Sequence, residues 1–444
     1  NNPKGYVCNV VKELFQTKSI VQIGLLIIGY SLIALAIPRM EFTSFLAVYS
    51  ALFIGYFYLV RNDLSIQSIF VIGMIARVIF LFSTPSLSDD IYRFLWDGRL
   101  WVQGENPFQH IPQYFNENQG NLVGLDELYP KLNSKQYFAI YPPINQFIFG
   151  IAALIAPLGF FKAQFVIKII LIAGEILLFQ YAVKLLKHLN KNRALVALYF
   201  LNPLVIIEVT GNLHFEGLMA TFLIMAFYYL KTERWAVSAV FMAFGVCTKL
   251  IPLLYLPLVL PFLGFIKTTK YISIVGIVSA LLFIPFMNLE LALNMLNSID
   301  LYFQSFIFNS FVYSILIDIS GDESKKWIAF VLALVPAFAV LRLAFKNSNF
   351  ENLMQRSFWV HSLYYFFSAV VHPWYLVTLL ALNIFQELKY ILVWSYLIGL
   401  TYFTYRTLPY EESSFIIALE YVVVITWGLI DFFRSRKKQA VATH

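Results

Sequence analysis

The chain has 444 residues, of which 60% are hydrophobic, 18% aromatic and 13% charged, and its formal net charge is +7. A soluble domain carries about 25% charged residues, so the composition excludes a soluble enzyme and predicts an integral membrane protein. The positive charge is attributed to lysines and arginines that anchor cytoplasmic loops, and no nucleic-acid partner is expected. Apolar runs of about 20 residues recur along the chain, which favours spanning helices over the strands of a barrel.

The apolar runs predict an all-α polytopic protein with fourteen spans, within a range of twelve to fifteen. The first three spans are 20–37, 43–60 and 66–82, followed by a polar outer segment at 83–161. The next six precede a second outer segment at 288–325, and they are 163–183, 194–209, 213–230, 235–248, 250–265 and 271–287. The last five are 327–344, 357–371, 374–386, 390–405 and 413–433. With no internal repeat, residues 1–444 are interpreted as one membrane domain.

Basic residues give the predicted orientation. The tail 434–444 is rich in lysine and arginine, which marks it as cytoplasmic. Fourteen spans then place both termini in the cytoplasm and the segments 83–161 and 288–325 outside. The apolar run 143–158 is short for a span, and counting it would move the basic cluster 184–193 outside. It is therefore predicted to be a juxtamembrane helix at the outer surface, although an arrangement with fifteen spans stays open.

The densest group of charges lies at the start of the first outer segment. Residues 88–99 contain three acids and two bases: Asp89, Asp90, Asp97, Arg93 and Arg99. Charges at a membrane edge are costly to desolvate and therefore indicate a functional site. In a helix, carboxylates at this spacing lie beside an arginine and could act as a general base next to an anionic leaving group. The alternative is a set of helix caps and intrahelical pairs.

A second polar group, 208–217, lies at the predicted outer turn between two spans. Its Asn212, His214 and Glu216 could bind a metal ion, a sugar hydroxyl or a phosphate. The alternative is an exposed polar turn in which two glycines allow close approach of helices.

Two cations and one histidine complete the candidate set. Lys249 interrupts an apolar stretch at another outer turn, where it could neutralise a phosphate or extend to the interface. Arg77 lies within the third span and needs an anion, either a lipid phosphate or an interhelical carboxylate. Glu175 is expected to pair inside the bundle. His372 lies at a further outer turn and is either an interfacial polar residue or part of the site.

The order of short motifs resembles that of the polytopic GT-C glycosyltransferases over about residues 65–380. The motifs are 88–99, Gly104-Glu-Asn-Pro-Phe108, Tyr141-Pro-Pro143, Asn202-Pro203, Gly211-Asn-x-His214, Thr248-Lys249 and His372-Pro-Trp-Tyr375. The likeness is greatest to bacterial and archaeal mannosyltransferase-like members that use polyprenyl-phosphate sugars.

The resemblance implies a GT-C fold with juxtamembrane helices in a long, catalytic first outer loop. It implies that Asp89 or Asp90 is the base, and that transfer inverts the sugar by single displacement. Arg77, Arg93 and Lys249 would then bind the donor phosphate. The further candidates for substrate contacts or a second acid are Asp97, Arg99, Asn212, His214, Glu216 and His372. No cofactor is required, and any divalent cation, Mg²⁺ or Mn²⁺, would be held by Asp89, Asp90 and Glu216.

The predicted function is therefore transfer of a hexose, mannose by resemblance, from a polyprenyl-phosphate donor on the outer face of a bacterial inner membrane. The acceptor would be a hydroxyl of a glycolipid, polysaccharide or protein, and membrane lipids would be further partners. Two alternatives stay open: a flippase or transporter of lipid-linked sugars, and a non-catalytic subunit of an envelope complex.

Overall fold

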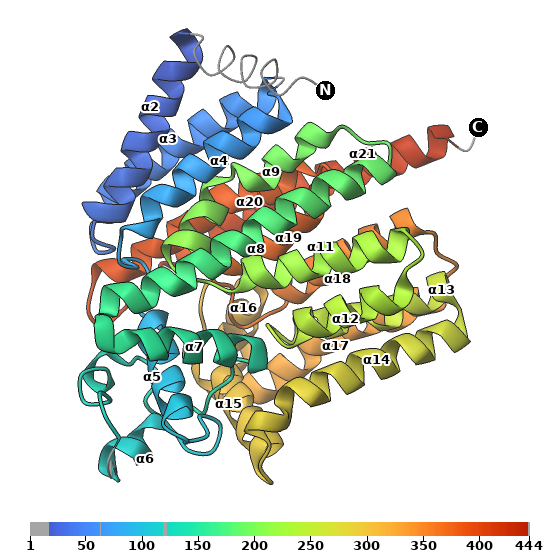
Figure 1. Cartoon of the computed structure of the whole chain (residues 1–444). Helices are drawn as coiled ribbons and strands as arrows, with labels where there is room; N and C mark the ends of the chain where they lie inside the picture. Colours follow the sequence, from blue (N-terminus) through green and yellow to red (C-terminus); the bar gives the residue numbers. More distant parts are fainter. Residues whose placement is uncertain (1–16, 63, 119–121, 443–444) are drawn as a thin grey trace, which may run out of the picture.

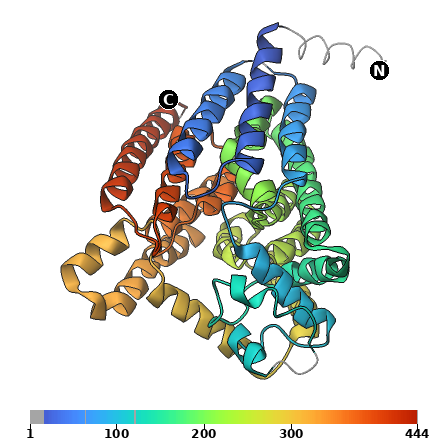
Figure 2. The same ribbon diagram turned by 90° about the vertical axis from the view of Figure 1, so that its left-hand side faces the viewer.

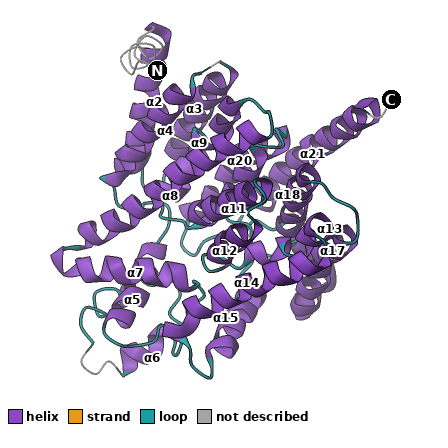
Figure 3. Cartoon of the chain, turned by 45° about the vertical axis from the view of Figure 1, so that its right-hand side comes forward, coloured by secondary structure: helices purple, strands orange, loops and turns teal. Residues whose placement is uncertain are grey.

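A computed structural model of the chain describes residues 17–62, 64–118 and 122–442. Over these ranges the protein is helical, with no β-strand beyond one isolated bridge between Phe308 and Val370 (Figure 3). The all-α prediction is therefore confirmed for the described part of the chain.

The first three helices are α2 (Thr17–Leu35), α3 (Phe42–Arg61) and α4 (Ile66–Leu81). They correspond to the first three predicted spans, and α2 packs against both α3 and α4 (Figure 1). The hydroxyl of Ser65 accepts the backbone N–H of Ser68 at 3.1 Å and so caps α4. The helix α4 ends at Leu81, shortly before the charged segment 88–99.

The described residues of the predicted outer segment form a layer, which we call the outer layer, with three helices, α5 (Asp90–Val102), α6 (Pro112–Glu117) and α7 (Pro143–Ile155). This layer lies at the lower end of the molecule in Figures 1 and 2, on the side opposite the start of α2 and the end of α21. A Cβ atom on Gly98 would lie 2.2 Å from the carbonyl oxygen of Phe149, so the contact between α5 and α7 requires glycine there. At about 1.5 Å per residue α7 is roughly 20 Å long, shorter than the hydrocarbon core of about 30 Å.

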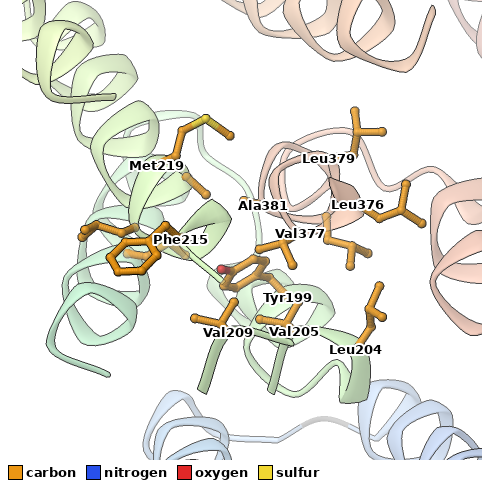
Figure 4. Close-up of a cluster of buried hydrophobic side chains, with 14 of the residues drawn as sticks. Tyr199, Leu204, Val205, Val209, Phe215, Met219, Leu376, Val377, Leu379 and Ala381 are labelled. Atoms are coloured by element: carbon orange, nitrogen blue, oxygen red, sulfur yellow. The ribbon is translucent and has the colours of Figure 1, made fainter. Parts of the chain in front are cut away.

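The remaining helices surround a buried centre. They are α8 (Phe160–His188), α9 (Ala197–Phe200), α10 (Pro203–Val205), a π-helical turn (Ile206–Gly211), α11 (Glu216–Lys231), α12 (Trp235–Val246), α13 (Leu260–Leu263), α14 (Phe265–Phe283), α15 (Leu291–Ser305), α16 (Val312–Ser320), α17 (Lys325–Ala344), α18 (Phe350–Phe366), α19 (Leu376–Asn383), α20 (Lys389–Leu397) and α21 (Ser414–Ala442). Figure 4 shows apolar side chains from 199–209, α11 and α19 meeting in this centre.

The number of spans differs from the prediction. Five helices in the described ranges are long and apolar enough to cross a membrane, and a bent pair, Arg193–Phe200 with Pro203–Gly211, makes up to six. Each of the fourteen predicted segments contains helical residues, but many helices are short or broken, so the count of fourteen is not confirmed. Pro203, Pro252 and Pro373 each lie in the first turn of a helical element. Proline is tolerated there because it lacks a backbone N–H, and the N–H groups of a first turn have no acceptor within the helix. Hydropathy alone does not reveal these breaks.

Two further predicted segments, the second outer loop and the basic tail, contain helices. The second outer segment, 288–325, carries α15 and α16 rather than a simple loop. The predicted basic tail, 434–444, continues α21 as far as residue 442, and residues 443–444 lie outside the described ranges.

Candidate active site

A cavity of about 590 Å³ lies between the outer layer and the helical body. Its wall combines the start of α5 and the segment 133–142 with the turn at Lys249. Arg39, residues 306–308, the 372–375 turn and the segment 404–412 also contribute to it. Three of the predicted outer clusters therefore meet at one cavity, although they are up to about 280 residues apart in the sequence. Asp89, Asp90, Arg93, Lys249 and His372 all line it.

The two adjacent aspartates at the start of α5 have different surroundings. Asp89 forms an ion pair of 2.8 Å with Arg39, and its side chain is 37% exposed. Asp90 is 22% exposed, accepts a hydrogen bond of 3.1 Å from the Tyr141 hydroxyl, and has no Lys or Arg within ion-pair distance among the described residues. Burial raises the pKa of the Asp90 carboxyl, with Lys249 and the Tyr141 hydrogen bond opposing the rise. Asp90 is thus the better placed of the two to accept a proton.

Lys249 extends into the same cavity from the turn after α12. Its Nζ lies 2.6 Å from Glu216 Oε1, and its side chain is 22% exposed while that of Glu216 is 1% exposed. The ammonium also lies 5.6 Å from the centre of the Tyr141 ring. One buried carboxylate thus positions the cation, while part of the ammonium remains available to a ligand in the cavity.

Arg93 and Asp97 form a pair that is mainly structural. The Arg93 Nε donates to Asp97 Oδ1 at 2.7 Å, while Nη1 donates to the backbone oxygens of Ser134 and Tyr137. Burial raises the pKa of the Asp97 carboxyl, and Arg93 opposes the rise. The pair attaches the segment 133–142 to α5, as the capping and intrahelical alternative implies. Asp97 does not line the cavity.

Arg99 is turned away from the cavity. Its guanidinium hydrogen-bonds to the backbone oxygen of Gly124 instead. The prediction that it contacts substrate is not supported, because its donors serve the fold of the outer layer.

The second predicted cluster is buried directly behind the cavity wall. Asn212 donates to Glu208 at 3.1 Å and accepts the backbone N–H of Leu87 at 3.3 Å. His214 lies between two acids, with Nδ1 3.9 Å from Asp90 Oδ2 and Nε2 3.5 Å from Glu208 Oε2. Burial, with a further contribution from Lys249, holds the pKa of His214 well below its usual value. The turn is therefore buried rather than exposed.

The imidazole of His214 also belongs to an aromatic stack. Its ring lies 3.7 Å from the Trp374 ring, and the other face of Trp374 stacks on His372 at 4.2 Å. Burial lowers the pKa of His372 to about 3. This stack connects the 372–375 turn, which lines the cavity, to the buried His214.

Arg77 requires a correction to the predicted phosphate site. Its guanidinium forms an ion pair of 2.7 Å with Glu175, and both side chains are 0% exposed. It also donates to the backbone oxygens of Gly73 and Phe200 at 3.0 and 2.9 Å. The anion that this arginine needs is therefore the mid-span carboxylate, and Arg77 does not line the cavity.

The carboxylates proposed for a divalent cation do not form a ligand set. Asp89 is paired with Arg39 and Glu216 with Lys249, which leaves Asp90 alone. Across residues 17–62, 64–118 and 122–442, no group of three His, Cys, Asp or Glu side chains is placed to hold a metal ion.

Sequence reasoning missed Arg39 and the aromatic residues of segment 404–412. Arg39 Nη2 donates to the Tyr410 hydroxyl at 2.7 Å, and its guanidinium lies 5.1 Å from the centre of the Tyr405 ring. All three residues line the cavity. The sequence did indicate Arg39 in one respect: it is a basic residue at a predicted outer turn, whereas lysine and arginine are usually enriched in cytoplasmic loops.

Comparison with known proteins identifies one family. The family model described as alpha-(1->6)-mannopyranosyltransferase, N-terminal domain, matches residues 11–265, more than half of the chain. The matched range includes α5, the Asn212–Glu216 turn and Lys249, but not the 372–375 turn. No curated protein matches the chain.

Proposed function

The chain belongs to the alpha-(1->6)-mannopyranosyltransferase family and is a glycosyltransferase, and we propose that it transfers mannose from a polyprenyl-phosphate donor to an acceptor hydroxyl at the outer face of the membrane. Its apolar helices are consistent with a membrane protein. The observation that carries the proposal is Asp90, a carboxylate without a Lys or Arg partner in the described part of the chain, facing the cavity beside Lys249.

The charges of the cavity support a lipid-phosphate donor. Lys249 and Arg39 line the cavity and keep N–H donors for a ligand, because among the described residues Lys249 forms one ion pair, with Glu216, and Arg39 uses one nitrogen for its polar contacts with Asp89 and Tyr410. When the sugar–phosphate bond breaks, negative charge develops on the leaving phosphate, and cations held in fixed positions stabilise that charge. We assign the donor phosphate to Lys249 and Arg39, with Arg93 in the wall and Arg77 outside the site.

The surroundings of Asp90 favour proton transfer. In the proposed reaction the acceptor O–H bond breaks, its proton moves to Asp90, and the oxygen lone pair forms a bond to the anomeric carbon. The bond from that carbon to the phosphate oxygen breaks, and its electron pair leaves with polyprenyl phosphate. A single displacement inverts the anomeric carbon, so an α-linked product requires a β-linked donor. A positioned general base contributes about 10²- to 10⁴-fold in rate.

The placement of charge also bears on the alternative of a transporter. Lys249, Arg39 and Asp90 line a cavity whose wall includes the segments 87–93 and 133–142 of the outer layer, whereas transporters place substrate sites near the bilayer midplane. The fully buried ion pair of Arg77 with Glu175 lies between helices and does not line the cavity.

The test is transfer by the purified protein in lipid vesicles supplied with polyprenyl-phosphate mannose carrying a radiolabel. We expect label to appear in an oligomannoside acceptor, with α configuration by NMR when the donor is β-linked. Movement of the labelled lipid between leaflets without transfer would identify a flippase instead. Transfer from a nucleotide sugar alone would contradict the assigned donor.

A further inference from the structure

The buried acid Glu208 has no assigned role, and its setting is unusual. It lies in the π-helical turn Ile206–Gly211, a rare conformation that is frequent at functional sites. Its carboxylate is 1% exposed and has no Lys or Arg within ion-pair distance among the described residues. A buried carboxylate within membrane-spanning structure is costly and indicates function.

The contacts of Glu208 lead to the cavity. One carboxylate oxygen accepts a hydrogen bond of 2.6 Å from the Tyr402 hydroxyl. The other accepts from Asn212 and lies 3.5 Å from His214 Nε2. The opposite nitrogen of the same imidazole lies 3.9 Å from Asp90. Asp90, His214 and Glu208 therefore form a continuous series from the cavity into the protein.

Stacking on Trp374 fixes the orientation of the His214 ring between the two carboxylates. The His214 imidazole lies nearly parallel to Trp374, at an interplanar angle of 13°. Its Nε2 is buried and makes no hydrogen bond within the described ranges. The separations on both sides are roughly 0.5 to 1 Å longer than a hydrogen bond, and catalytic hydrogen bonds often tighten only when substrate binds.

We propose that Glu208 is a positioning residue that holds the N–H of His214 on Nε2, so that Nδ1 of the neutral imidazole faces Asp90 and accepts a hydrogen bond from its carboxyl once Asp90 has taken the acceptor proton. This inference rests on the proposed function. A neutral imidazole carries one N–H, and a carboxylate beside one nitrogen selects the tautomer that places the N–H there. Asp90 is then restored as a carboxylate while the product departs.

The proton balance is closed by groups already named. The acceptor hydroxyl loses one proton to Asp90, and the protonated carboxyl donates a hydrogen bond to His214 Nδ1. Asp90 then gives the proton to water or to the phosphate product in the cavity and becomes a carboxylate again, while His214 stays neutral with its single N–H on Nε2. The other titratable groups that face Glu208 are Tyr402, Tyr49, Asp90 and Glu216.

The experiment compares Glu208→Gln with Glu420→Gln. Glu420 is a matched control because it is also fully buried in a helix and accepts hydrogen bonds, from Trp394 and Asn309, without contacting His214 or lining the cavity. For Glu208→Gln we expect kcat to fall by about 10- to 100-fold with KM for donor and acceptor unchanged. For Glu420→Gln we expect kcat within about threefold of the wild type.

Further readouts separate positioning from a structural role. Both variants are checked by gel filtration and thermal unfolding. The double variant Glu208→Gln/His214→Gln should lose no more than His214→Gln alone, because the two residues act as a unit. Equal losses in Glu208→Gln and Glu420→Gln, or an unchanged kcat in Glu208→Gln, would overturn the inference.

Two further outcomes are distinguished from each other. If Glu208→Gln does not fold, His214→Gln decides, since an unchanged kcat there excludes the positioning role and a loss in kcat without a change in KM supports it. All rates are measured with whichever mannosyl donor supports transfer. An inactive wild type with polyprenyl-phosphate mannose therefore refutes the proposed donor without deciding the role of Glu208.

Discussion

Replacing Arg77 by methionine tests whether this arginine supports the fold or the donor site. Both members of its pair with Glu175 are fully buried, and the guanidinium makes three short polar contacts. Removing one partner of a buried pair leaves an uncompensated charge and costs about 3–5 kcal/mol. We therefore expect Arg77→Met to lower the free energy of unfolding by about 3 kcal/mol or more.

The double variant sharpens this prediction. In Arg77→Met/Glu175→Gln no charge is left unpaired, so the loss should be smaller than the sum of the two single losses by at least about 2 kcal/mol. Stability is measured by denaturant unfolding in detergent micelles, and donor KM is measured on the folded fraction. Unchanged stability with a tenfold higher donor KM in Arg77→Met would refute the structural role and restore Arg77 to the phosphate site.

Three further predictions concern the cavity. In Tyr141→Phe the acid limb of kcat/KM should move to higher pH. The hydrogen bond from Tyr141 lowers the pKa of Asp90, so its loss raises that pKa, and the base acts only when deprotonated; an unmoved limb would exclude Asp90 as the titrating group. Lys249→Gln should raise the donor KM by about tenfold and leave the acceptor KM unchanged, and equal changes in both would contradict phosphate binding. Chelation by EDTA should leave the transfer rate unchanged, because Asp89 and Glu216 are already paired with cations; loss of activity restored by Mg²⁺ or Mn²⁺ would show a metal requirement.

The sequence predicted which outer segments meet, because each carries polar residues at the end of an apolar run. Asp90, Lys249 and His372 were identified in this way, and the structure brings all three to one cavity. Sequence could not separate Asp89 from Asp90, since they differ in partners that come from distant elements. Arg39 follows α2 and Tyr141 precedes α7.

Two other features depended on tertiary structure. The partner of Arg77 is Glu175, 98 residues away, and both residues were recognised as mid-span charges without their contact being predictable. The count of spans failed for a different reason, because local breaks divide several apolar runs into short helices. Hydropathy measures how apolar a run is and contains no information on its continuity as a helix.

The central claim is that Asp90 removes the acceptor proton, and the adjacent carboxylates provide the most direct measurement. The rate of mannose transfer under saturating donor and acceptor is compared for Asp90→Asn and Asp89→Asn. We expect kcat of Asp90→Asn to fall by about 10²- to 10⁴-fold. Asp89→Asn loses a partly exposed pair worth about 1 kcal/mol at most, so its kcat should stay within about fivefold of the wild type. An active Asp90→Asn, whether or not Asp89→Asn is inactive, would contradict the account.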